Sequence, residues 1–88
     1  MTDEQNKETM KEAIETLNQI SGNPSTPKTI KKSITDLIND LNSEEYSMSV
    51  RAANAISMLD DITQDPNMPS YVRTQLWQAV SKLEGIRE

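Results

Sequence analysis

The chain has 88 residues, a net charge of -5 and an aromatic content of 3%, so it is long enough for one small domain, residues 1–88, with an aliphatic core. It contains neither Cys nor His, which excludes zinc sites built on thiolates or imidazoles, disulfide scaffolds and nucleophiles activated by histidine. No apolar run approaches the roughly 20 residues of a membrane span, and we expect a cytoplasmic protein that has no cofactor and does not bind a membrane.

Four amphipathic segments follow one another along the chain. In each of them apolar residues recur at the spacing of one helix face. This spacing predicts helices over residues 3–21, 27–41, 47–63 and 69–86, and no strands. The predicted buried residues are Met10, Ile14, Leu17 and Ile20; Ile30, Ile34, Leu37, Ile38 and Leu41; Ala52, Ala55, Ile56, Leu59 and Ile62; and Val72, Leu76, Val80 and Leu83, with Ile86 as an extension.

Residues typical of helix ends flank these segments. A capping box that begins at Thr2 is expected to start the first helix. Gly22 is expected to end it in the left-handed conformation, which glycine adopts at little cost. Thr26, followed by Pro27, is the predicted cap of the second helix, and Ser47 that of the third.

An internal repeat relates the two halves of the sequence. A shift of 42 positions aligns residues 13–42 with 55–84, and seven of the thirty aligned pairs are identical. Because these pairs are apolar residues and prolines, they mark a repeated supersecondary unit and not a shared active site. The repeat predicts two helical hairpins, residues 3–42 and 47–86. The identical pairs are Ala13/Ala55, Ile14/Ile56, Leu17/Leu59, Ile20/Ile62, Pro24/Pro66, Pro27/Pro69 and Leu41/Leu83.

Two all-α architectures satisfy this pattern. In an up-and-down four-helix bundle, both hairpins close on one core. In a HEAT-like pair, the hairpins stack and leave an apolar face open. We favour the bundle, because two units are fewer than the three or more that a solenoid usually needs.

Three motifs carry a resemblance to a known family. They are Val50-Arg51-Ala52-Ala53-Asn54-Ala55-Ile56, Asp65-Pro66-Asn67-Met68-Pro69 and Arg73-Thr74-Gln75-Leu76-Trp77. With these motifs, the chain from about Met10 to Glu88 resembles an uncharacterised family of short archaeal proteins. The resemblance implies a cytosolic all-helical bundle, and it transfers no catalytic or binding residue.

The strongest candidates for a partner-binding site are Arg51, Tyr71, Arg73 and Trp77. Arg51 and Arg73 stand early in their helices, where the helix dipole does not favour a cation. Each is explained either by pairing with a carboxylate at the end of a neighbouring helix or by binding a partner. Trp77 lies about 100° from the core position of Leu76, so it either sits on the rim, within reach of Arg73 for a cation–π pair, or fills a gap in the core.

Other polar residues are weaker candidates. Asp60, Asp61 and Asp65, with Glu84 near the far end of the hairpin, supply oxygen ligands without a defined cation-binding geometry, so we expect no metal site and no catalytic residue. Asn54 lies among small residues, where it would need hydrogen-bond partners if buried.

We therefore expect a non-enzymatic protein-interaction or structural module whose second hairpin contacts an unknown protein partner or a second copy as a homodimer. The alternative is weak association with nucleic acid or a nucleotide. That function would require five basic residues to gather on one face of an acidic protein, which makes it less favoured. These residues are Lys28, Lys31, Lys32, Arg51 and Arg73.

Overall fold

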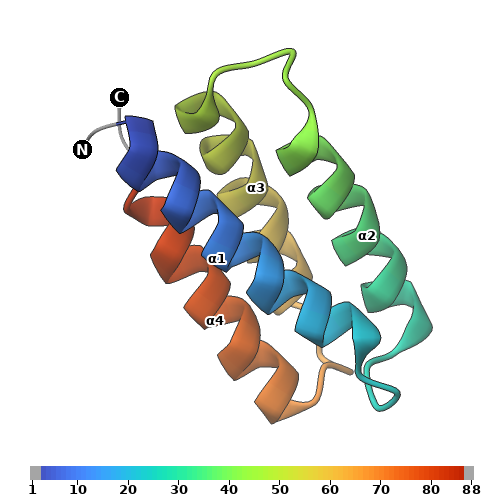
Figure 1. Ribbon diagram of the computed structural model, residues 1–88. Helices are drawn as coiled ribbons and strands as arrows, with labels where there is room; N and C mark the ends of the chain where they lie inside the picture. Colours follow the sequence, from blue (N-terminus) through green and yellow to red (C-terminus); the bar gives the residue numbers. More distant parts are fainter. Residues whose placement is uncertain (1–2, 87–88) are drawn as a thin grey trace.

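Four helices make up most of residues 3–86, the part of the chain that the computed structural model describes (Figure 1). They are α1 (Asp3–Gly22), α2 (Lys28–Asn42), α3 (Met48–Thr63) and α4 (Ser70–Glu84), and this range contains no strand. Consecutive helices run antiparallel, and α1 and α3 each pack against both α2 and α4 (Figure 1). The favoured closed up-and-down bundle is therefore confirmed over the open HEAT-like pair.

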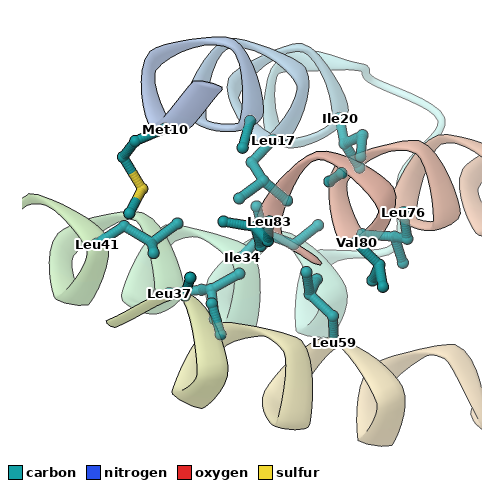
Figure 2. Close-up of a cluster of buried hydrophobic side chains, with 14 of the residues drawn as sticks. Met10, Leu17, Ile20, Ile34, Leu37, Leu41, Leu59, Leu76, Val80 and Leu83 are labelled. Atoms are coloured by element: carbon teal, nitrogen blue, oxygen red, sulfur yellow. The ribbon is translucent and has the colours of Figure 1, made fainter. Parts of the chain in front are cut away.

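One core at the centre of the bundle takes side chains from all four helices. Its large members are aliphatic, and Figure 2 shows Leu17, Ile34 and Leu83 meeting in the interior although they come from three helices. The predicted helix stripes supply most of this core. Its buried members are Met10, Ala13, Leu17, Ile20, Ile30, Ile34, Leu37, Leu41, Ala52, Ala55, Leu59, Met68, Val72, Leu76, Ala79, Val80, Leu83 and Ile86.

The repeat seen in the sequence is also a repeat of structure. The bounds of α2, residues 28–42, become those of α4, residues 70–84, after the shift of 42 positions. The predicted extension of the last helix to residue 86 is wrong. The amide of Gly85 donates to Lys82 O at 3.1 Å and that of Ile86 to Leu83 O at 3.1 Å, and these bonds across three residues tighten the chain and end α4. Ile86 is nevertheless buried, as predicted.

The expectations for the turn between α1 and α2 are wrong in two respects. No glycine among the described residues has a positive φ, so Gly22 does not end α1 in the left-handed conformation. Thr26 does not cap α2. Its buried hydroxyl instead donates to Ile20 O at 2.8 Å, which satisfies a carbonyl at the end of α1 that has no partner within the helix.

The other predicted caps have different outcomes. Ser47 caps α3 as predicted, because its hydroxyl accepts from the amide of Val50 at 3.4 Å. The capping box proposed at Thr2 lies outside the described residues.

Candidate functional site

The junction between α2 and α3 is held by Arg51. This half-buried residue is near the start of α3, and its Nη1 donates to Leu41 O at 2.8 Å, in the last turn of α2. The last carbonyls of a helix have no partners within it, and a cation is favoured at this negative end. The sequence raised the possibility of a helix-end carboxylate as the partner, and the structure shows a helix-end carbonyl in its place.

Arg73 makes the equivalent connection between α3 and α4. Its Nε donates to Thr63 O at 3.2 Å and its Nη2 to Asp65 O at 3.1 Å. These carbonyls belong to the last residue of α3 and to the turn that follows. The guanidinium is therefore satisfied by backbone oxygens, and the cation–π pair with Trp77 is not needed to explain its position.

The two arginines lie at opposite ends of the bundle. Arg51 is near the start of α3 and Arg73 is near the start of α4, and these antiparallel helices begin at opposite ends (Figure 1). The four residues proposed as one partner-binding surface therefore do not come together. Arg51 is separated from Tyr71, Arg73 and Trp77, which share one helix.

All three aromatic residues of the chain lie on the surface. Trp77 is 54% exposed and Tyr71 is 44% exposed, both on α4, and Tyr46, between α2 and α3, is 58% exposed. The question of whether Trp77 fills the core is thus decided in favour of the rim. Asn54 is exposed as well, so it is not a buried polar residue that sets the register of the helices.

From Ser70 to Ser81, the outward side of α4 forms a surface without charged residues, which we call the aromatic face, and the exposed Glu84 follows it in the last turn. Its six members are all exposed: Ser70, Tyr71, Thr74, Trp77, Gln78 and Ser81. Its orientation follows from two interactions on its flanks. Arg73 reaches towards α3, and Lys82 pairs with Glu12 of α1 at 3.0 Å. The aromatic face lies between these flanks and is turned away from the core.

The same positions of α2 carry a different surface. After the shift of 42 residues, the members of the aromatic face correspond to Lys28, Thr29, Lys32, Thr35, Asp36 and Asn39, all of which are exposed. Three charged residues of α2 are thus replaced by Ser, Thr and Gln in α4, and two threonines by Tyr and Trp. Thr74, Gln78 and Ser81 were not among the predicted site residues, although comparison of the exposed positions of the repeat would have indicated them.

The acidic residues considered for cation binding do not converge. Asp60 and Asp61 are exposed, and Oδ1 of Asp65 accepts a hydrogen bond from the amide of Asn67 at 2.9 Å within the turn. Glu84 is exposed at the other end of α4. Within residues 4–86, no three Asp or Glu side chains are close enough to hold a metal ion together.

The basic residues are also dispersed. Lys28 and Lys32 are exposed and Lys31 is half-buried, all in the first turns of α2. That end of the bundle is opposite to Arg51 (Figure 1). The single basic face required for the nucleic-acid alternative is therefore not assembled.

A hollow of about 170 Å³ lies between α2 and α3 and was not predicted from the sequence. Leu37, Ala55 and Met58 provide apolar walls, and Tyr46 and Arg51 also line it. The hollow is formed by residues from both sides of the interhelical turn, and helix periodicity within one segment does not reveal such a combination.

Comparison with known proteins identifies the family. A family model described as uncharacterised protein family UPF0147 matches residues 1–86. The chain belongs to this family. UPF0147 has no established function, so membership supports the fold and assigns no activity.

Relatives and solved structures agree with this identification. UPF0147 proteins of the archaea Sulfurisphaera tokodaii and Metallosphaera sedula are 42% and 43% identical to the chain over 83 residues, and each alignment covers 94% of the chain and 93% of the relative. A crystal structure of a UPF0147 protein from Thermoplasma acidophilum matches with a TM-score of 0.88 at 32% identity, covering 96% of this chain and 99% of that one. Another crystal structure, of a protein of unknown function, matches with a TM-score of 0.86 at 40% identity, covering 91% of each chain.

The resemblance to an archaeal all-helical family is thereby confirmed. Among the helices between residues 3 and 86, none combines the length and the hydropathy of a membrane-spanning segment.

Proposed function

We propose that this UPF0147 protein is a non-enzymatic protein-interaction module that binds its partner through the aromatic face of α4. The observation that carries the proposal is the exposure of Trp77 and Tyr71 on a helix face without charged residues. Trp and Tyr are enriched among the residues that dominate interface energies, and charged residues are depleted at interface centres. The aromatic face has both properties.

The energetic argument concerns what these side chains gain when they are covered. The exposed half of the Trp77 side chain contributes no apolar burial to folding. Covering this half, an area of about 100 Å², would release about 2–3 kcal/mol. The surrounding Ser, Thr and Gln side chains can hydrogen-bond a partner without the desolvation cost of a buried charge. Docking through this face therefore gains apolar contact at small electrostatic cost.

Among residues 4–86, the charged side chains near the helix ends have structural partners or face solvent. The two arginines hydrogen-bond helix-end carbonyls, and the acidic residues near the end of α3 lie in exposed or turn positions. We place the protein in the cytoplasm, where a chain without Cys needs no oxidising environment to fold.

The test is capture of partners from an extract of the source cells by the immobilised protein. Wild-type protein is compared with Trp77→Ala and with Tyr46→Ala, which removes an equally exposed aromatic ring outside the aromatic face. Circular dichroism and thermal unfolding verify that the variants are folded. We expect a partner that is retained by Tyr46→Ala and lost by Trp77→Ala. A partner retained equally by all three proteins, or no partner in any of them at low or high salt, would overturn the proposal.

A further inference from the structure

The aromatic residues of α4 are arranged symmetrically along the helix. Tyr71 and Trp77 lie three residues before and three residues after Thr74, and all three are exposed. Residues three apart on a helix are neighbours on its surface and form a continuous row. Thr74 is thus the centre of a row that has an aromatic ring at each end.

We propose that the partner of the aromatic face is a second copy of this chain, related by a two-fold axis that passes by Thr74. This inference rests on the proposed function and names the partner of the same surface. An interface about a two-fold axis uses the same patch twice, so residue i meets residue j and j meets i. With the axis running across the row at Thr74, Trp77 of each copy lies on Tyr71 of the other.

The packing of two helices in this way has a defined geometry. Aligned rows of residues three apart make the two α4 helices cross at a steep angle, with Thr74 at the point of closest approach. A small side chain at that point lets the backbones approach, and the two Trp–Tyr contacts lie on either side of it. Such ring pairs contribute beyond the apolar area that they bury.

The aromatic face can meet its own copy without bringing like charges together. Each copy carries a net charge of -5, so two copies repel one another at a distance. The outward surface of α1 exposes Glu8 and Glu15 together with Lys7 and Lys11, and that of α2 exposes Asp36 and Asp40 together with Lys28 and Lys32. Like charges juxtaposed across an interface are unfavourable, and the aromatic face brings none of its own.

One face of a single short helix makes a small interface. Interfaces that bury less than about 1,200 Å² are typical of weak or transient contacts. The dimer is therefore expected to form and dissociate with protein concentration, and measurements must extend to about 1 mM, where weak affinities become visible.

Because the chain has no Cys, a single introduced thiol tests the axis directly. In Thr74→Cys the two thiols meet at the point of closest approach, within the separation that a disulfide spans. Thr35→Cys is the matched control, because it changes an exposed threonine on α2. With an added oxidant, we expect covalent dimers from Thr74→Cys at a rate at least about tenfold above the control. Equal rates would overturn the proposed axis.

Sedimentation equilibrium of the purified protein tests the partner independently. We expect a dimer whose dissociation constant rises by at least about tenfold in Trp77→Ala and stays unchanged in Tyr46→Ala. A wild-type protein that is monomeric at about 1 mM, or a dimer insensitive to Trp77→Ala, would overturn the second copy as partner. If the Trp77-dependent partner captured from extract is then a different protein, the interaction module stands and only this inference fails.

Discussion

The two hairpins share their buried positions and differ on their outward sides. Helices α1 and α3 bury Leu17 and Leu59, and helices α2 and α4 bury Leu41 and Leu83. The two residues of each pair are related by the repeat. By contrast, Thr35 of α2 corresponds to Trp77 of α4. Core positions are constrained by close packing on every side, whereas an outward position can change with little effect on folding. Exposed positions of a repeat can therefore diverge without loss of stability, and a binding surface can arise there in one hairpin alone.

The hairpins also differ in the side chains that fill the core. The first hairpin contributes mostly large side chains such as Ile34 and Leu37. The second contributes several small ones, among them Ala52, Ala55 and Ala79. Small side chains allow closer helix approach and release less free energy on burial. The second hairpin combines core side chains that are smaller on average with the aromatic face.

The largest expected effect comes from truncating the equivalent leucines. Leu17 and Leu59 are both 0% exposed, and Leu17→Ala or Leu59→Ala is expected to lower the free energy of unfolding by about 2–5 kcal/mol. Leu17→Ala should cost at least as much as Leu59→Ala, because α1 buries Met10 and Ile20 beside Leu17 where α3 has Ala52 and the partly buried Ile62. Urea unfolding monitored by circular dichroism measures both, with exposed Ser57→Ala as the control. A clearly greater loss of unfolding free energy in Leu59→Ala than in Leu17→Ala would contradict this comparison of the two halves of the core.

The turns of the two hairpins should differ in sensitivity. Arg73→Met keeps an apolar stem but removes the hydrogen bonds to Thr63 O and Asp65 O, and the free energy of unfolding is expected to fall by about 1–3 kcal/mol. Thr26→Val in the first turn should cost less, about 0.5–1.5 kcal/mol, because Ile20 O also accepts from the amide of Asn23 at 3.2 Å. Urea unfolding compares the two variants. Equal or reversed costs would show that the arginine bonds contribute less than their geometry indicates.

The smallest effect on stability should accompany the largest effect on binding. Trp77→Thr gives α4 the residue that α2 has at the equivalent position. Because Trp77 is 54% exposed, we expect the free energy of unfolding to fall by no more than about 1 kcal/mol, together with loss of partner binding. Urea unfolding and capture from extract are measured on the same preparation. A marked loss of stability would mean that the Trp77 ring supports the fold. The difference between Thr35 of α2 and Trp77 of α4 would then be explained by folding and not by binding.

Much of the fold was predictable because helix periodicity is a local property. The stripe that includes Ile30, Ile34 and Leu37 identifies the buried side of α2 without knowledge of its neighbours. Ser47 was likewise predictable as a cap, because its hydroxyl bonds an amide only three residues away. Thr26 was not, because its acceptor lies six residues back on the preceding helix, and a hydroxyl can either cap the next helix or donate to the previous one.

The four helices, their buried stripes and the repeat were predictable from the amino-acid sequence, since each is a pattern of side-chain spacing along the chain. The tertiary structure decided which groups meet and which remain in water. Arg51 and Arg73 find backbone carbonyls ten residues away only after the helices have packed. Trp77 lies beside the buried stripe, where a neighbouring helix either covers a side chain or leaves it exposed. That outcome depends on the positions of whole helices, so only the packed bundle shows that its ring faces solvent.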